Sequence, residues 1–435
     1  MTESDIIIIG AGPGGMDTAS AACAKGKKVV LIEKNEIGGT CLNRGCIPTK
    51  ALAKTAQIVL DSKEASTFGV NIQDVNIDFR SIMERKDEVV KSLREGALMA
   101  LKGVTIIEGV AEFTDNKTIT AAGEVFTAPT IIIATGSTPA RLPIPGSEYA
   151  IDSDSVLEMT ELPKRITIIG GGVIGIEFAS ILNAFGSDVT VIEFCKEILP
   201  PFDKDIAKRL RMSLSKRGVN ILTSAGVTEI KDNGTVVYES KGKISEIEGD
   251  AVIMAVGRRP VLPKGLEKAG VEVGKRGIIV NERFETTAKG IYAIGDVNAQ
   301  CMLAHAAVAQ GKTILGEDVD INVIPSAVFS VPECSMVGLT EEQCKEQSIG
   351  YKSVKIPFRG NGKAVAMGEP DGLMKLLTES STGKILGVHI CGPHAADLIS
   401  EPALAMANGL NAESIARTIH AHPTLGEILL TAVTR

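Results

Sequence analysis

Residues 5–15 read DIIIIGAGPGG, and residues 166–175 read ITIIGGGVIG. In the first stretch a short apolar strand runs into Gly10, Gly12 and Gly15, and a helix-like segment at 16–27 and a second strand ending on Glu33 follow. This order predicts a complete βαβ unit, in which the glycines allow a tight turn and close approach of a pyrophosphate to the helix N-terminus. A carboxylate at the end of the second strand can bind ribose hydroxyls.

The second stretch repeats the first in the same register. Gly170, Gly172 and Gly175 are followed by Glu193, and 193 − 170 equals 33 − 10, which is 23. A single glycine pattern is weak evidence, but two complete units at one spacing predict two dinucleotide sites in two Rossmann-like domains. Because both units end on Glu, which repels a 2′-phosphate, we expect FAD or NAD(H) in preference to NADP(H).

The composition is that of a soluble globular protein. The 435 residues are enough for roughly three domains, 44% are hydrophobic, and the formal net charge is −7. No long basic block favours nucleic acid. The first residues, MTESDIIIIGAG, contain no basic segment or apolar stretch of signal-peptide length, so we expect a cytoplasmic protein without a membrane anchor.

Cys41 and Cys46 are the one closely spaced pair among eight cysteines, within GGTCLNRGCIPTK at 38–50. They could be metal ligands, a structural link or a redox disulfide. In a reducing compartment a close pair is more often catalytic or metal-binding than structural. Zinc needs about four ligands, and no histidine precedes His305, so we expect no metal at this pair.

Three further glycine turns follow strand-like runs, at Gly136, Gly257 and Gly295. Taken singly, the first two are typical of ordinary strand exits. Asp296 is more informative, because an acid directly after a buried strand of an α/β sheet is well placed to bind a polyhydroxyl chain.

With the two nucleotide units, the cysteine pair, GIYAIGD at 290–296 and HAHPTLGE at 420–427, nearly the whole chain resembles the pyridine nucleotide-disulfide oxidoreductases. Within that family it is most similar to members that oxidise dihydrolipoamide. The resemblance implies FAD in the first unit, contacted by Gly10, Gly12, Gly15, Glu33, Gly39, Thr40, Lys50, Ala111, Gly136, Asp296, Met302, Ala304 and His305. It implies NAD in the second, contacted by Gly170, Gly172, Gly175, Glu177, Glu193, Val227 and Gly257.

The resemblance also implies an order of domains. An FAD-binding domain at 1–145 is interrupted by an NAD-binding domain at 146–264, resumes at 265–320, and is followed by a dimerisation domain at 321–435. Strand-like runs at 324–339 and 372–392, without another glycine fingerprint, independently predict a C-terminal α+β domain. Only eight residues follow Glu427, fewer than this family usually carries, so we expect either a smaller dimer interface or a slight loss of stability.

The catalytic roles follow from the same resemblance. The resemblance implies a redox disulfide between Cys41 and Cys46, in which Cys41 exchanges with substrate and Cys46 faces the flavin. Lys50, four residues later on a helix expected to begin near Pro48, shares its face, could lower a thiolate pKa and pairs with Glu177.

His422 is the expected base, oriented by Glu427, because a histidine titrates near neutral pH; we assign the neighbouring His420 to packing. The implied cycle oxidises dihydrolipoamide to lipoamide and passes electrons from Cys46 through FAD to NAD⁺. It runs in a homodimer whose sites combine both chains and is served by a lipoyl-bearing protein of a 2-oxoacid dehydrogenase or glycine cleavage system.

Two alternatives remain at this point. Glutathione-reductase-like enzymes share the cysteine pair but use NADPH and place basic residues where Glu193 stands. A non-catalytic flavoprotein subunit of a complex would have no use for Cys41, Cys46, His422 and Glu427 together.

Overall fold

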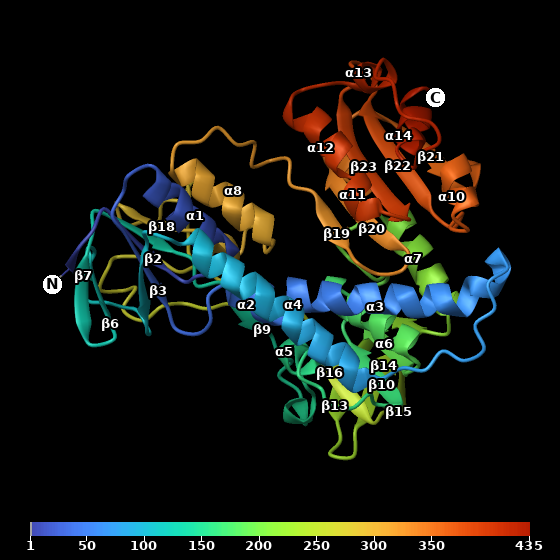
Figure 1. Cartoon of the computed structure of the whole chain (residues 1–435), viewed down its shortest axis with the longest axis horizontal. Helices are drawn as coiled ribbons and strands as arrows, with labels where there is room; N and C mark the ends of the chain where they lie inside the picture. The colour runs from blue at the N-terminus through green and yellow to red at the C-terminus, as the bar shows by residue number, and fades with distance from the viewer. Residues whose placement is uncertain (1) are drawn as a thin grey trace.

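The computed structural model describes residues 2–435. The chain forms three parts, with the first nucleotide unit at one end and the second unit and the C-terminal domain at the other (Figure 1). Two long helices, α3 and α4, run across the middle between them (Figure 1). The predicted fold of two Rossmann-like units and a C-terminal α+β domain is confirmed.

The first unit is built on a five-stranded parallel sheet in the order β18-β8-β2-β3-β4. The strands are β2 (Ile6–Ile9), β3 (Val29–Glu33), β4 (Thr105–Glu108), β8 (Thr130–Ile133) and β18 (Ile291–Ala293). Ile7 and Ile8 point to opposite faces and both are fully buried, which explains why β2 is an unbroken apolar run. Because β18 pairs with β8, the chain returns to the first sheet after completing the second unit.

The second unit has a four-stranded parallel sheet in the order β12-β11-β10-β16. Its strands are β10 (Arg165–Ile169), β11 (Asp188–Glu193), β12 (Asn220–Thr223) and β16 (Ala251–Met254). An antiparallel sheet follows β12 along the chain, formed by β13 (Ala225–Ile230), β14 (Thr235–Ser240) and β15 (Lys243–Glu248). The two βαβ units therefore share one plan.

The C-terminal domain is a five-stranded antiparallel sheet in the order β19-β20-β23-β22-β21. The strands are β19 (Ser326–Val328), β20 (Glu333–Gly338), β21 (Tyr351–Pro357), β22 (Leu373–Glu379) and β23 (Ile385–Gly392). Val388 and Ile390 pack on one face with the C-terminal helix. Cys334 and Cys391 pack on the other face, in the hydrophobic cluster of the second nucleotide unit.

Two small sheets complete the strand set: β1 (Thr2–Glu3), β5 (Glu112–Phe113), β6 (Thr118–Ala121) and β7 (Glu124–Thr127) in one, and β9 (Ser137–Pro139) with β17 (Arg258–Pro260) in the other. The α-helices are α1 (Pro13–Ala24), α2 (Gly39–Arg44), α3 (Cys46–Glu64), α4 (Phe79–Ala100), α5 (Ser153–Val156), α6 (Val173–Phe185), α7 (Lys204–Lys216), α8 (Ala304–Ile314), α9 (Glu341–Glu346), α10 (Gly362–Ala366), α11 (Ala395–Leu398), α12 (Ser400–Ala407), α13 (Ala412–Ala416) and α14 (Glu427–Val433). The 3₁₀ turns are η1 (Ala65–Phe68), η2 (Ser147–Tyr149), η3 (Gly295–Asn298) and η4 (Phe358–Gly360).

The start of α3 differs from the sequence expectation. The helix begins at Cys46, two residues before the predicted start at Pro48. Gly45, with φ −149° and ψ −108°, separates it from α2. Pro48 then lies in the first turn, where its missing N–H removes no helical hydrogen bond. Cys46 therefore stands at a helix N-terminus.

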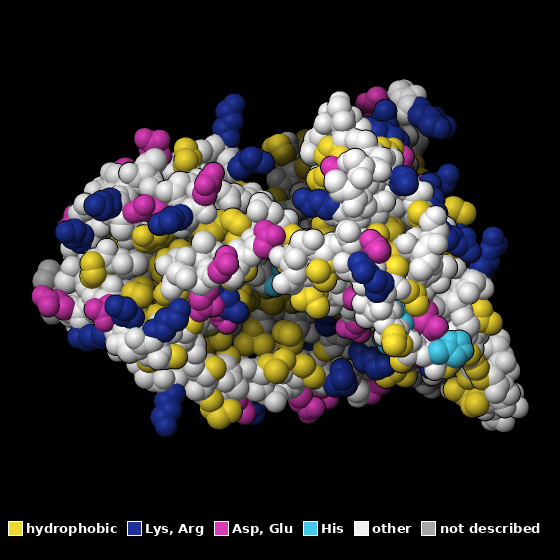
Figure 2. Space-filling view, turned by 90° about the horizontal axis from the view of Figure 1, so that it is seen from above, with side chains coloured by type: hydrophobic (Ala, Val, Ile, Leu, Met, Phe, Trp, Pro, Cys, Tyr) yellow, Lys and Arg dark blue, Asp and Glu magenta, His cyan; other side chains and the backbone are white. Residues whose placement is uncertain are grey.

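The outer surface carries charges of both signs. On the face seen in Figure 2, basic and acidic side chains are interspersed, and hydrophobic side chains gather in a hollow near its middle. Within residues 2–435, no helix combines the length and the apolar character that crossing a membrane requires.

Candidate active site

The residues predicted for FAD gather at one edge of the first sheet. Gly10, Glu33, Gly136 and Asp296 lie at or just beyond the carboxyl ends of β2, β3, β8 and β18, which are neighbours in that sheet. The carboxyl edge of a parallel sheet is where α/β folds bind ligands. Sequence positions nearly 300 residues apart thus form one edge.

The first glycine turn leaves room for a phosphate group. Gly10 has φ +106°, and a Cβ there would lie 2.3 Å from the carbonyl oxygen of Ala134. A Cβ on Gly15 would lie 2.0 Å from the carbonyl oxygen of Gly10, so both positions require glycine. At Gly12 nothing lies within 4 Å, and the N-terminus of α1 has no side-chain cap. Free amides facing open space fit a pyrophosphate.

The second glycine turn repeats this arrangement. Gly170 has φ +107° and its Cβ would lie 2.4 Å from Ala255 O, whereas nothing lies within 4 Å of Gly172. A Cβ on Gly175 would lie 2.0 Å from the carbonyl oxygen of Gly170. The N-terminus of α6 likewise has no side-chain cap. Both turns therefore fit dinucleotides.

Glu33, at the end of β3, and Glu193, at the end of β11, accept equivalent pairs of backbone hydrogen bonds. Glu33 accepts hydrogen bonds from Ala11 N at 2.6 Å and Asn35 N at 2.8 Å. Glu193 accepts from Gly171 N at 2.5 Å and Cys195 N at 2.6 Å. A carboxylate offers about four acceptor positions, so each keeps about two for ribose hydroxyls.

Apart from Lys50, the remaining residues predicted for FAD come from three segments. Gly39, with φ +56°, lies so close to the first glycine turn that its Cβ would be 2.7 Å from Gly12 Cα. Thr40 is half-buried beside it in α2. Ala111 is buried between β4 and β5. Met302, Ala304 and His305 lie at the start of α8, where His305 Nε2 is 2.7 Å from Pro325 O.

The remaining residues predicted for NAD surround the second turn. Val227 lies on β13 and packs in the cluster that contains Ile192 of β11. Gly257, with φ +106°, follows β16 and has nothing within 4 Å of its Cβ position. Both lie beside the strand ends that carry Gly170 and Glu193.

Sequence reasoning missed two residues that support Asp296. Ser137 donates its hydroxyl to the Asp296 carboxylate, and Arg258 donates to Ser137 Oγ through Nε at 2.8 Å. Ser137 and Arg258 lie on the paired strands β9 and β17. In the sequence, Ser137 directly follows ATG at 134–136 and Arg258 directly follows AVG at 255–257. A polar residue at these two equivalent positions is the signal that could have revealed them.

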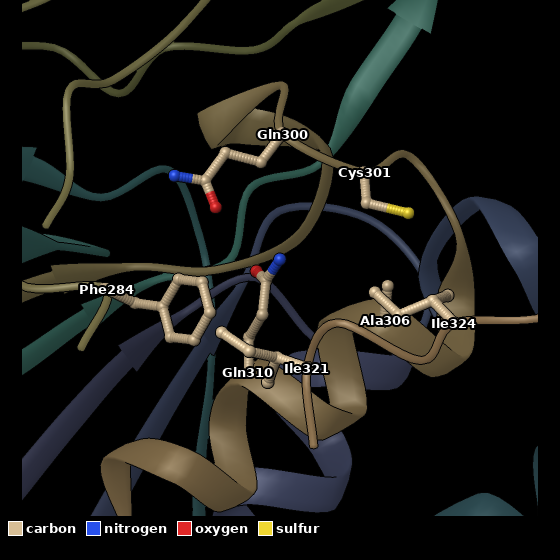
Figure 3. Close-up of a pocket in the computed structure, with 7 residues that line it drawn as sticks. All are labelled: Phe284, Gln300, Cys301, Ala306, Gln310, Ile321 and Ile324. Atoms are coloured by element: carbon tan, nitrogen blue, oxygen red, sulfur yellow. The ribbon is translucent and has the colours of Figure 1, made fainter. Parts of the chain in front are cut away.

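A pocket beside α8 lies next to the Asp296, Ser137 and Arg258 group, but none of these three residues lines it. Its lining residues are Phe284, Gln300, Cys301, Ala306, Gln310, Ile321 and Ile324 (Figure 3). Gln310 accepts hydrogen bonds from Gly295 N at 2.7 Å and Asn298 Nδ2 at 3.0 Å. The pocket's main buried polar group is therefore used to fix η3, the turn that carries Asp296.

Cys41 and Cys46 lie together as free thiols, the reduced form of the predicted redox pair. Cys41 is in α2, and Cys46 is the first residue of α3. The pKa of Cys46 is lowered to about 7, chiefly because Cys41 hydrogen-bonds its thiolate, and the charge of Lys50 lowers it further against the effect of burial. The pKa of Cys41 is raised, by that same hydrogen bond and by burial. Cys46 is thus the thiolate near neutral pH.

Lys50 and Glu177 form the predicted ion pair. Lys50 Nζ lies 3.0 and 2.9 Å from the two carboxylate oxygens, and the Glu177 side chain is only 5% exposed. Phe329, directly after β19, donates its backbone N–H to Glu177 at 2.9 Å, and its ring centroid is 4.5 Å from Lys50 Nζ. This pair joins α3, the second unit and the C-terminal domain, and the contact from Phe329 was not predicted.

His422 and Glu427 also form the predicted pair. His422 Nδ1 lies 2.9 Å from Glu427 Oε1, and Glu427 Oε2 accepts from Thr424 N at 2.8 Å. The Thr424 amide and then His422 hold the pKa of Glu427 below its usual value. The His422 side chain is 81% exposed, whereas His420 is 8% exposed and hydrogen-bonds Glu401 at 2.9 Å. His420 is therefore a packed residue, whereas the His422 ring is open to solvent.

The structure does not bring the histidine to the cysteines of its own chain. Ile428 and Leu429 of α14 pack against the face of the C-terminal sheet opposite to the second nucleotide unit. α14 is accordingly well separated from α2, which carries Cys41 (Figure 1). Within one chain the thiol pair and the His–Glu pair are therefore separate from each other.

Among residues 2–435, no cluster of three or more His, Cys, Asp or Glu side chains is arranged to hold a metal ion. The described residues offer at this site two thiols, an adjacent lysine and two glycine turns that fit dinucleotides. Such a site defines a flavin-dependent disulfide oxidoreductase.

Comparison with known proteins agrees with this class. The family model described as pyridine nucleotide-disulphide oxidoreductase matches residues 4–311, and the model of the dimerisation domain of the same family matches residues 324–433. The chain therefore belongs to the pyridine nucleotide-disulphide oxidoreductase family, as an FAD- and NAD-dependent enzyme of disulfide chemistry.

Individual proteins within the family are similar to this chain over nearly its whole length. The chain is 41% identical to the dihydrolipoyl dehydrogenase of Geobacillus stearothermophilus, over 99% of this chain and 95% of that protein. It is also 41% identical to that of Chlamydia muridarum, over 98% and 95%. Among solved structures, the HOCl-induced flavoprotein disulfide reductase RclA from Escherichia coli matches with a TM-score of 0.87 and 31% identity, over 99% of each chain.

The lowered pKa of Cys46 predicts a pH-dependent reactivity. In the reduced protein, the alkylation rate of Cys46 by iodoacetamide should rise as pH increases through about 7, because only the thiolate reacts. Lys50→Met should move this midpoint to higher pH, since it removes a positive charge beside the thiolate. Peptide mass spectrometry measures the rate.

Lys54→Met is the matched control, because Lys54 is exposed one turn further along α3. The control should leave the midpoint where it is. An unchanged midpoint in Lys50→Met would show that Lys50 does not stabilise the thiolate.

Proposed function

We propose that the protein oxidises dihydrolipoamide to lipoamide and reduces NAD⁺. The observation that carries this proposal is the Cys41–Cys46 dithiol, in which one thiol is held as a thiolate beside the ion pair that joins the two nucleotide units. The 41% identity to dihydrolipoyl dehydrogenases over nearly the whole chain supports dihydrolipoamide as the substrate.

The reaction begins at His422. Its Nε2 accepts a proton from a substrate thiol, while Nδ1–H is held by Glu427 at 2.9 Å, which fixes the tautomer that a base requires. The substrate thiolate attacks Cys41 Sγ of the oxidised pair, and Cys46 leaves as a thiolate. Lys50 and the N-terminus of α3 stabilise that leaving group.

The second substrate thiol then completes the exchange. It gives up its proton to solvent and attacks the substrate sulfur bound to Cys41, which closes the lipoamide disulfide and expels Cys41 as a thiolate. His422 returns its proton to Cys41. The two electrons of the substrate now reside in the protein dithiol, in which Cys41 stabilises the thiolate of Cys46 by lowering its pKa.

Bound FAD supplies the two-electron redox chemistry between this dithiol and NAD. Gly10, Gly12, Glu33 and Asp296 would hold FAD, and Gly170, Gly172 and Glu193 would hold NAD. The ion pair between Lys50 of α3 and Glu177 of α6 would hold the helix that begins with Cys46 in a fixed position against the second nucleotide unit.

We also propose that the working unit is a homodimer with shared sites, in which the thiol pair of one chain faces His422 and Glu427 of the other. The exposure of His422 and the position of α14 across the sheet from its own cysteines support this arrangement. A two-fold interface would create two equivalent sites, each built from both chains.

Domain limits, location and partner complete the proposal. We place the domain limits at 1–145, 146–264, 265–320 and 321–435. Cysteine usage typical of a reducing compartment supports a cytoplasmic location. The lipoyl group is expected to arrive on a carrier protein of a 2-oxoacid dehydrogenase or glycine cleavage system.

The choice between NAD and NADP depends on Glu193. In Glu193→Arg, kcat/KM for NAD⁺ should fall by about tenfold or more, because a charge-assisted hydrogen bond to the ribose is lost. The preference over NADP⁺ should weaken or reverse, since arginine attracts a 2′-phosphate. Glu239→Arg on β14 is the control, because it makes the same charge change at an exposed position of the second unit.

A steady-state comparison of substrates tests the proposed function. NADH formation from free dihydrolipoamide should be fast, and reduction of glutathione disulfide by NADPH should be at background. The reverse ranking would assign the protein to the glutathione-reductase-like alternative. A folded, flavin-loaded protein that is inactive in both assays would favour the non-catalytic subunit.

A further inference from the structure

Two cysteines outside the active site lie opposite each other on neighbouring strands of the C-terminal sheet. Cys334 on β20 and Cys391 on β23 are direct partners in the antiparallel register, and both are fully buried. They are 57 residues apart in the chain, so their spacing in the sequence does not reveal the contact. In the structure they form the second cysteine pair of the protein.

The register shows that their geometry suits a disulfide. Leu339 N donates to Leu386 O at 2.8 Å, which makes 339 and 386 a hydrogen-bonded pair of the same ladder. Hydrogen-bonded and non-hydrogen-bonded pairs alternate, and Cys334 lies an odd number of residues from Leu339, so Cys334 and Cys391 are a non-hydrogen-bonded pair. Such pairs have Cα atoms about 4.5 Å apart, within the span of about 4.4–6.8 Å that a disulfide bridges.

The side chains are also in contact. The Cys391 thiol lies close enough to Cys334 to help raise its pKa. They lie in the apolar cluster between the C-terminal sheet and the second nucleotide unit, together with Ile206 and Leu210 of α7. Burial raises the pKa of Cys334, so this thiol stays protonated, and the buried pair is shielded from reagents while this interface is closed.

We propose that Cys334 and Cys391 are a second dithiol–disulfide site, separate from Cys41 and Cys46, which small disulfides such as glutathione disulfide oxidise to a cross-strand disulfide. One cysteine thiolate attacks glutathione disulfide and releases one glutathione. The other attacks the mixed disulfide and releases the second. One S–S bond forms and one breaks, and the two thiol protons pass to the two glutathiones. Oxidation is slow, because the interface must open first.

The bond has a stabilising role. It links strands that already pair, so it restricts the unfolded chain more than the folded one. The thermal midpoint of the oxidised protein should rise by about 5 °C or more.

The FAD-loaded Cys41→Ser/Cys46→Ser protein tests this site in isolation from the active-site thiols. It is incubated with excess glutathione disulfide in a low concentration of urea, which promotes opening of the buried interface. The incubation ends when Cys344, a buried cysteine of the same domain, begins to react with glutathione disulfide. The remaining thiols are then blocked with N-ethylmaleimide, and the protein is digested without reduction. Cys344 is the internal control, since it is equally buried in the same domain on α9. We expect one cross-linked peptide that contains Cys334 and Cys391 and is lighter by two hydrogen atoms.

Cys334→Val is the matched variant, because valine has a similar volume. It should give only a glutathione adduct on Cys391 and no rise of the thermal midpoint. Free thiols, separate adducts on Cys334 and Cys391, or cross-links shared at random with Cys344 in the parent protein would each overturn the proposal.

Discussion

Replacing Cys46 by serine should reduce dihydrolipoamide oxidation by about 1,000-fold or more, because the thiol relay is lost as a unit. Flavin binding should survive, since Cys46 supplies no part of the glycine cradle around Gly10 and Gly12. The measurement combines NADH formation with the flavin absorbance of the purified variant. A yellow, inactive protein is the expected result.

Cys23→Ser provides the matched control. Cys23 is half-buried like Cys41 and Cys46 but lies in the last turn of α1, with Sγ beside Lys102 O. This variant should keep wild-type activity. Full activity in Cys46→Ser would exclude the disulfide mechanism.

Mixing two inactive chains should restore activity. Cys41→Ser and His422→Gln homodimers should each lose activity, the latter by about 100- to 10,000-fold as expected for a general base. Their heterodimer would contain one site with all wild-type residues and one with both substitutions. After co-refolding, activity should recover toward half the wild-type value per heterodimer.

Cys41→Ser mixed with Cys46→Ser is the control, because each site of that heterodimer carries one damaged thiol. It should stay inactive. Absence of recovery in a verified Cys41→Ser/His422→Gln heterodimer would show that the base acts within its own chain.

Much of the fold could be predicted because its determinants are local. At Gly10 and Gly170 the positive φ, and at Gly15 and Gly175 the close backbone contact, are requirements that only glycine meets, so the spacing of these residues reports the βαβ unit directly. The apolar run of β2 likewise reports a strand buried on both faces.

The parts that escaped prediction depend on contacts between distant segments. Ser137 and Arg258 support Asp296 only because β9 and β17 pair. Cys334 and Cys391 meet only through the register of β20 and β23. Neither strand pairing leaves a periodic signal in the sequence.

The start of α3 was misplaced for a different reason. Proline is a common first-turn residue, and a sequence pattern fixes a helix boundary only to within about two to four residues. The consequence is functional, because the true start gives Cys46 the helix N-terminus that favours its thiolate.

Labelling the active-site thiols through one turnover tests the central claim most directly. The oxidised, FAD-loaded protein is mixed anaerobically with dihydrolipoamide, a sample is blocked with N-ethylmaleimide, and NAD⁺ is then added before a second sample is blocked. Peptide mass spectrometry should find Cys41 and Cys46 unlabelled before the substrate, both labelled after it, and both unlabelled again once NADH has formed. NADH formation with no change in the labelling of Cys41 and Cys46 would contradict the account.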